Sequence, residues 1–268
     1  MEITTMIRHL LYLASSVILC CTYIQADEIE LSSMDDLQSI GKSVKAGKEL
    51  KQVLDFGFAN TTGDAETLNI NAKYALSFTT IGYNEKALKV ALDTSVFISE
   101  TETIRDNEEY KFNLGLEQFV YEKWLGYASV NWLRNEFQNY DIKLSLGAGV
   151  GKEIVSTKKD SLTLKIGLAY NLEGYTNGQE DDKYVSLNEY IEYKHTFNDV
   201  SSLYLQLGSL QNVSDFSDFD VNFIGGLSFK VAENISLTLE EEIRYDKIPP
   251  VGFDSTNTKT IIRIGYNF

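Results

Sequence analysis

The chain has 268 residues and a formal net charge of −15, from 24 Lys and Arg against 39 Asp and Glu. Acidity of this size repels phosphate backbones, which argues against a nucleic-acid partner. Only 2 Cys and 2 His are present, and because Cys20 and Cys21 share the first apolar run while His195 stands alone, the sequence argues against a zinc or thiol enzyme. We expect no metal and no cofactor.

Residues 1–26 have the pattern of a secretory signal peptide, with Arg8 before a short apolar run and Ala26 as a small residue at the expected cleavage site. A membrane anchor is the alternative, but serine and threonine interrupt the run, which is short for a spanning helix. Cleavage would leave a mature chain without cysteine, which suits passage through an oxidising periplasm. The expected compartment is the envelope of a Gram-negative bacterium.

Residues 27–49 are polar and charged, and their apolar positions have helical spacing. Two glycines weaken this helix, so a loosely ordered alternative stays open. We expect a periplasmic N-terminal segment before the main domain at 50–268.

From about residue 50 onward the hydrophobic pattern has a period of two. Near the end, Ile262, Ile264, Tyr266 and Phe268 form one row, and the opposite row is mostly polar. A soluble β-sandwich also alternates, but its strands are usually shorter and its apolar face points inward. The abundance of 16 Tyr, 14 Phe and 18 Gly with 2 Pro favours a barrel with an apolar outer surface.

The pattern predicts an all-β fold, a transmembrane antiparallel β-barrel of about 12 strands of the outer-membrane type. Short connections alternate with longer, more acidic ones, as expected for periplasmic turns and external loops. The expected strands cover residues 50–60, 66–79, 86–99, 108–121, 124–136, 140–153, 161–173, 184–196, 201–212, 219–230, 234–246 and 256–268.

Aromatic residues end the last segment, where Tyr266 and Phe268 resemble the C-terminal signal read by the barrel-assembly machinery. Four further motifs resemble the YdiY-like family of salt-induced outer-membrane proteins, whose domain has no defined function: residues 57–64, 135–141 and 146–151, and the pair Pro249-Pro250. Asp64 and Asn135 depart from the family pattern. The resemblance implies an outer-membrane location and a barrel, and it carries no catalytic assignment.

The polar rows are expected to face the lumen. The charged residues that we expect there to matter most are Lys143, Lys165, Glu240, Glu242, Arg244, Lys259 and Arg263. Counting all inward positions gives nine basic residues against six acidic ones, an expected excess of positive charge. Either the lumen is a narrow wet pore, or opposite charges such as Glu240 and Glu242 with Lys259 and Arg263 pair and close it.

Acidic clusters occur in the expected loops, including Glu109 after residue 100 and Asp220 after residue 213. Such oxygen clusters can hold calcium, but no EF-hand pattern is present, so a solvated surface is expected. Two other carboxylates, Glu189 and Glu241, interrupt rows assigned to lipid. For these we expect a β-bulge that turns each inward, with contact to a second copy as the alternative.

The sequence favours a non-enzymatic role, as a narrow channel for small solutes or ions or as a structural, stress-related envelope protein. The alternative is an outer-membrane enzyme that acts on lipid or peptide at the external rim. His195 is expected at the periplasmic end beside Tyr193, as an interfacial side chain rather than a catalytic one. Expected partners are outer-membrane lipids, lipopolysaccharide and the barrel-assembly machinery, and the oligomeric state stays open.

Overall fold

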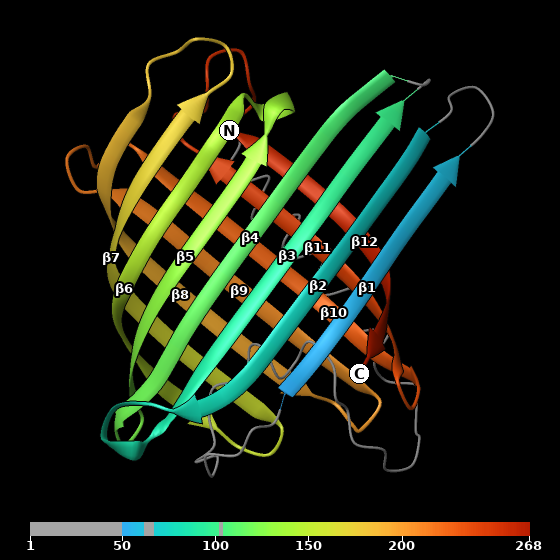
Figure 1. The fold of residues 1–268 in the computed structure, drawn as a ribbon, viewed down its shortest axis with the longest axis vertical. Coiled ribbons are helices and arrows are strands. Elements are labelled where there is room, and N and C mark those ends of the chain that lie inside the picture. The colour runs from blue at the N-terminus through green and yellow to red at the C-terminus, as the bar shows by residue number, and fades with distance from the viewer. Residues whose placement is uncertain (1–49, 62–66, 102–103) are drawn as a thin grey trace.

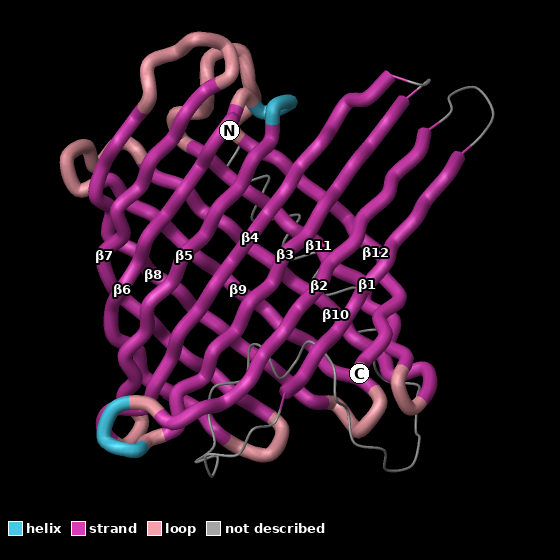
Figure 2. Tube along the Cα trace, viewed as in Figure 1, coloured by secondary structure: helices cyan, strands magenta, loops and turns pink. Residues whose placement is uncertain are grey.

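A computed structural model describes residues 50–61, 67–101 and 104–268. The expected signal peptide and periplasmic segment, residues 1–49, lie outside the described residues. Within the described part of the chain, twelve strands and two short 3-10 helices, η1 (Tyr83–Glu85) and η2 (Glu136–Gln138), account for the regular structure (Figure 2). No described helix is long and apolar enough to cross a membrane.

The strands form one closed antiparallel barrel, in which each pairs with its neighbours in sequence and β1 pairs with β12 (Figure 1). Because the barrel is closed, no strand has an edge of unpaired backbone N–H and C=O groups, which a sheet in a membrane requires. The strands are β1 (Leu50–Thr61), β2 (Thr67–Ile81), β3 (Ala87–Thr101), β4 (Ile104–Tyr121), β5 (Trp124–Asn135), β6 (Tyr140–Ser156), β7 (Asp160–Tyr175), β8 (Asp182–Thr196), β9 (Ser201–Asn212), β10 (Phe219–Ala232), β11 (Ile235–Asp246) and β12 (Thr256–Asn267).

This architecture confirms the expected fold class. The expected boundaries shift most at β4, which begins at Ile104 rather than at residue 108, and at β6, which continues to Ser156. The strands β3 and β4 are therefore paired as far as Thr101 and Ile104, where the sequence predicted a longer acidic loop.

The two ends of the barrel differ. Connections that follow β2, β4, β6, β8 and β10 are short and lie at one end, which we call the turn end, together with Leu50 and Phe268 (Figure 1). Most of the longer connections, including 176–181, 213–218 and 247–255, lie at the other end, the loop end (Figure 1). Short turns and both strand termini at one end match the expected topology.

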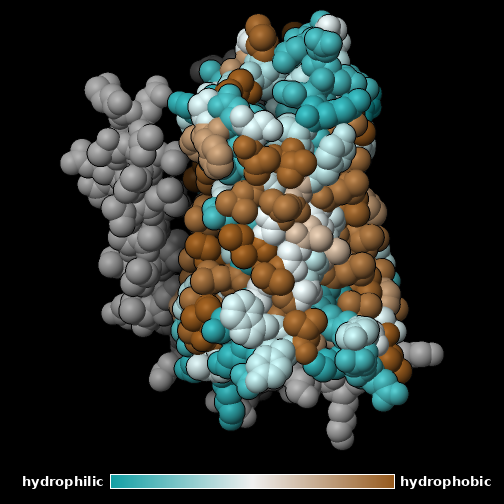
Figure 3. Space-filling model, turned by 90° about the vertical axis from the view of Figure 1, so that its left-hand side faces the viewer, coloured by the Kyte–Doolittle hydropathy of each residue, from teal (hydrophilic) through white to brown (hydrophobic). Residues whose placement is uncertain are grey.

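The distribution of polarity is the reverse of that in a soluble protein. Large apolar side chains in mid-strand face outward, and Ile262, for example, is 61% exposed. Charged residues such as Asp55 and Arg263 are instead buried inside the barrel. On the side of β6 and β7 the outer surface shows an apolar belt between hydrophilic ends (Figure 3). Such a belt is what a membrane-spanning barrel presents to lipid.

Candidate functional site

The lumen holds the charged residues of the inward rows. Each strand alternates, so every second side chain points into the barrel, and the long charged ones meet across its interior. The structure places all seven lumen residues expected from sequence in ion pairs inside the barrel, namely Lys143, Lys165, Glu240, Glu242, Arg244, Lys259 and Arg263.

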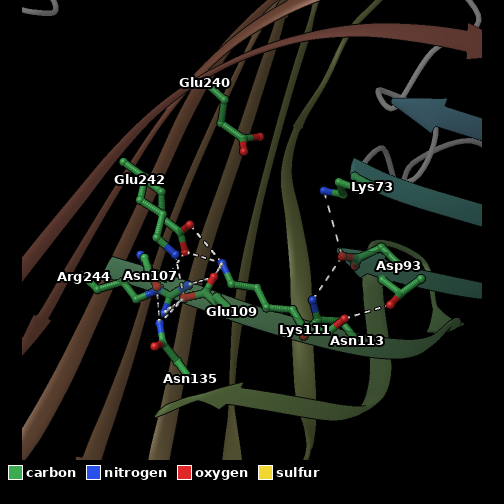
Figure 4. A network of polar contacts seen from close by, with 12 residues as sticks. Lys73, Asp93, Asn107, Glu109, Lys111, Asn113, Asn135, Glu240, Glu242 and Arg244 are labelled. Atoms are coloured by element: carbon green, nitrogen blue, oxygen red, sulfur yellow. Dashed lines mark hydrogen bonds and ion pairs between the residues drawn. The ribbon is translucent and has the colours of Figure 1, made fainter. Parts of the chain in front are cut away.

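Five side chains from β4, β11 and β12 form what we call the Glu109 cluster. Figure 4 labels four of them, Glu109, Lys111, Glu242 and Arg244. Glu109 receives a bidentate pair of hydrogen bonds from Arg244, both 3.0 Å, and lies 2.5 Å from Lys259 Nζ. Lys111 Nζ lies 2.8 Å from Glu242 Oε1, and Arg244 Nε donates to the same oxygen at 2.8 Å. Three cations therefore surround two carboxylates, and the cluster crosses the lumen.

A second group, the Lys143 cluster, lies nearer the loop end. Lys143 Nζ is 2.9 Å from Glu173 and 2.8 Å from Asp220, with Asp246 at 3.9 Å. The Tyr140 hydroxyl donates to Asp246 at 2.9 Å, and the Lys143 ammonium lies over the Tyr140 ring. One cation among three carboxylates makes this part of the lumen acidic.

Two further groups of ion pairs lie in the lumen. Lys165 on β7 binds Glu117 on β4 and lies 2.9 Å from Glu192 on β8. Arg263 lies 2.6 Å from Glu240, to which the Tyr204 hydroxyl also donates. Since buried charges are stable only when paired, these contacts explain why a barrel interior tolerates so many.

The expected excess of positive charge is wrong. Glu109 and Asp220 were grouped with the loop carboxylates, although each lies just inside an expected strand, and both form ion pairs in the lumen. Glu173 and Asp246 join them from the ends of β7 and β11. The signal was present, because each of the four is in phase with the inward row of its own strand. Arg263 pairs with Glu240 as expected, whereas the ion pairs of Lys259 and Glu242 run to Glu109, Lys111 and Arg244.

A cavity of about 670 Å³ occupies the lumen on the loop side. Loop residues Phe137, Pro250 and Phe253 line it at one end, and Lys165 and Glu192 are among the lining residues nearest the turn end. None of the lining residues is among the three residues of each strand that lie nearest the turn end. At the turn end, small and polar side chains such as Ser202 and Ser236 are buried instead. The cavity is therefore a vestibule on the loop side that ends before the turns.

Inward tyrosines pack on glycines of neighbouring strands. A Cβ added to Gly226 would lie 2.2 Å from the Tyr204 ring, and one added to Gly208 would lie 2.7 Å from the Tyr190 ring. In the motif at residues 146–151, Gly149 faces Gly167 so closely that a Cβ would lie 2.2 Å from the Ile166 carbonyl oxygen. These glycines let large rings lie flat on the barrel interior.

The C-terminal residues lie at the seam where the barrel closes. The Phe268 amide donates to the Gln52 carbonyl oxygen at 3.1 Å, which extends the pairing of β12 with β1. The rings of Tyr266 and Phe268 contact each other edge to face, and the Phe268 side chain is 69% exposed on the outside. Both side chains are thus available to an external partner.

Carboxylates at the loop end are held by protein groups. Asp215 accepts hydrogen bonds from the amide and hydroxyl of Ser217, and these bonds lower the pKa of its carboxyl. Arg105 binds Glu100 and Glu108. Within the ranges that the structure describes, no group of three or more Asp, Glu, His or Cys is arranged to hold a metal ion.

His195 lies at the turn end of β8 on the outer surface. Its Nδ1 is 2.7 Å from Asp160 Oδ1, which also accepts a hydrogen bond from the Tyr193 hydroxyl at 2.8 Å. The imidazole packs against the Phe197 ring. This group lies outside the barrel, apart from the vestibule.

The expectation of β-bulges at Glu189 and Glu241 is wrong. The pairing of β8 with β7 and β9 runs through Glu189 without a shift, and that of β11 with β10 and β12 runs through Glu241 without one. Bulges occur in other places, such as near Lys230 in β10. Both carboxylates therefore stay on the outer surface.

Comparison with known proteins agrees with this fold. The family model described as "Protein of unknown function, DUF481" matches residues 54–268. An outer-membrane channel from Pseudomonas putida F1 is similar in structure, with a TM-score of 0.52 and 12% identity over 89% of this chain and 100% of that chain.

Weaker similarity links the chain to the NanC porin, with a TM-score of 0.45 and 10% identity over 81% of this chain and 98% of that one. The translocator domain of the autotransporter NalP from Neisseria meningitidis has a TM-score of 0.45 and 13% identity over 87% of this chain and 91% of that chain. No curated protein matches. Since the family model covers most of its length, the chain belongs to the DUF481 family, whose function is undefined.

Proposed function

We propose that the chain is an integral outer-membrane protein that forms a narrow channel for small polar solutes or ions, closed in the conformation described here. The observation that carries this proposal is the vestibule of about 670 Å³, which begins at the loop end and is crossed by ion pairs. Loops would face the cell exterior and turns the periplasm.

The barrier that we propose across the vestibule is the Glu109 cluster. Lys111 on β4 and Glu242 on β11 are separated by four strands along the shorter way around the barrel, so their ion pair spans the interior. Charged side chains that bridge a lumen are long and can change rotamer, unlike a plug of packed apolar residues. The cluster is therefore suited to act as a movable barrier.

The outer surface supports the proposed partners. Its apolar belt would contact the acyl chains of outer-membrane lipids, and its loops would lie among lipopolysaccharide headgroups. The exposed aromatic side chains of Tyr266 and Phe268 would be read by the barrel-assembly machinery. We propose no catalytic activity, because the His195–Asp160 pair lies outside the barrel at the turn end, away from the vestibule.

The experiment is conductance in planar bilayers. The double variant Lys111→Ala/Glu242→Ala removes one cation and one anion across the lumen, so it widens the passage without changing net charge. The matched control is Lys73→Ala/Asp93→Ala, which removes a pair 3.9 Å apart on neighbouring strands. We expect current steps with the first variant and wild-type behaviour with the control. Silence of both variants would contradict the channel and favour a structural envelope role.

A further inference from the structure

Two carboxylates lie on the outer surface within the apolar belt. Glu189 on β8 is exposed between Leu187 and Ile191, and Glu241 on β11 lies between Leu239 and Ile243. A carboxylate that faces lipid at mid-strand is costly. A residue in this position therefore needs a compensating contact.

Each carboxylate has one hydroxyl partner on the next strand. Ser209 Oγ donates to Glu189 Oε2 at 3.1 Å, and Thr260 Oγ1 donates to Glu241 Oε2 at 2.5 Å. A carboxyl group has two oxygens, so one hydroxyl donor leaves part of its hydrogen-bonding capacity unused. Acyl chains offer no polar group to it.

The register relates the two carboxylates. Glu189 pairs with Ser209, Ser209 with Val221 and Val221 with Tyr245. The line perpendicular to the strands from Glu189 thus meets β11 four residues nearer the loop end than Glu241. Whether the carboxylates share a depth depends on the strand tilt.

The strand ends measure that tilt. At the loop end, the line from Asp246 of β11 meets β8 at Asn188, six residues below the first residue of β8. At the turn end, the line from Thr196 of β8 meets β11 at Thr238, three residues above its first residue. A residue of β11 at the same height as a residue of β8 therefore lies three to six residues nearer the turn end than the point where the perpendicular line from β8 meets β11. The offset of four lies within this range, which places Glu189 and Glu241 at similar depths.

We propose that the outer surface of β8 to β11 is an interface with a second copy of this chain. A two-fold axis along the membrane normal keeps depth unchanged, so it brings Glu189 of each copy opposite Glu241 of the other. Two carboxyl groups that share one proton form a strong hydrogen bond, which replaces their contact with lipid. A similar depth of the two residues is the condition that such an axis requires.

The surface between the carboxylates suits this contact. Halfway between them at a similar depth lie Leu207 on β9 and Phe223 on β10, which face each other in the register. Gly225, the register partner of Glu241, has no side chain of its own, and the apolar side chains of Phe223 and Leu205 lie over it. The axis therefore passes through an apolar contact flanked on both sides by a carboxyl pair. The inference rests on the membrane location proposed above.

Cysteine crosslinking in outer membranes tests the interface. Cys20 and Cys21 are changed to Ser, and Leu207→Cys puts a single thiol beside the axis. The control is Leu116→Cys on β4, on the opposite side of the barrel. With a short bifunctional thiol reagent we expect a band at twice the monomer mass for Leu207→Cys and none for the control. The membrane fraction and heat-modifiable gel mobility report location and folding separately.

Variants of the carboxylates make the test specific. In the Leu207→Cys background, Glu241→Leu should lower the crosslinked fraction about tenfold, because both carboxyl pairs are lost. Glu241→Lys should keep the crosslink, since it places opposite charges together, and the double variant Glu189→Lys/Glu241→Lys should abolish it. Crosslinking that is unchanged by Glu241→Leu, absent from folded Leu207→Cys protein or directed to a protein of another mass would overturn the proposal. If the lysine variants do not fold, the leucine variant decides.

Discussion

Glu109 and Arg244 form a bidentate ion pair inside the barrel, although 135 positions separate them in the sequence. The carboxylate is only 3% exposed and also serves Lys111 and Lys259. It is therefore the common acceptor of three cations. Its removal should disturb the lumen more than the loss of any single cation.

The first prediction is that Glu109→Gln lowers the free energy of unfolding by about 3–5 kcal/mol, because Glu242 is then the one carboxylate left in a cluster of three cations. The neighbouring Glu108 provides the control, since it binds the exposed Arg105 and Glu108→Gln should have little effect. Urea unfolding of protein refolded into lipid vesicles, followed by tryptophan fluorescence, measures both. Equal destabilisation by the two variants would contradict the role of Glu109.

A second prediction concerns the packing of rings on glycine. Gly226→Ala should destabilise the barrel by about 1–3 kcal/mol, because the new Cβ would overlap the Tyr204 ring and displace its hydroxyl from Glu240. Gly115→Ala is the matched control, since the nearest atom to its Cβ would be 4.0 Å away. The temperature at which each protein loses its heat-modifiable form gives the comparison. A control that is as unstable as Gly226→Ala would point to backbone effects of alanine instead.

Much of this architecture could be predicted from sequence, because period-two alternation is a local property that each strand repeats. Glu109 and Asp220 were grouped with the loop carboxylates because their contacts are not local in the sequence. Whether a carboxylate near a strand end joins the lumen network depends on pairing with distant cations such as Lys143 and Arg244, which no local pattern reveals.

Glu189 shows a second limit. Its position among apolar residues predicted a bulge, since lipid disfavours a carboxylate, but the register shows an unbroken strand. Twelve strands in a closed barrel must keep a common register, so one unfavourable side chain does not displace a strand held by neighbours on both sides.

A third prediction concerns assembly. Deleting Phe268 should lower the folded fraction in the outer membrane more than Phe268→Ala does, because deletion also removes the amide that donates to Gln52 at the seam. Phe268→Ala keeps that hydrogen bond and loses only the exposed ring. Heated and unheated samples on a gel report the folded fraction. Wild-type levels in both variants would argue against the terminal aromatic as an assembly signal.

A fourth prediction fixes the orientation of the barrel. Gly178 lies in the connection between β7 and β8 with a φ of +82° and open space around it, so a short tag there should be tolerated. An antibody should reach this tag on intact cells, because the loop end is expected outside. A tag at Asn84, in the turn between β2 and β3, should be reached only after the outer membrane is permeabilised. The reverse pattern would invert the topology.

The last prediction concerns ion preference, and it depends on where the lumen is acidic. Around Lys143 the carboxylates of Glu173, Asp220 and Asp246 outnumber the single ammonium, so an opened channel should prefer cations at its loop end. In the Lys111→Ala/Glu242→Ala background, Lys143→Glu together with Lys165→Glu should strengthen this preference, since charges in a narrow passage are weakly screened. Asp220→Asn should weaken it. The reversal potential in a salt gradient measures each change, and a shift toward anions on adding the two glutamates would show that the permeating ions do not pass these residues.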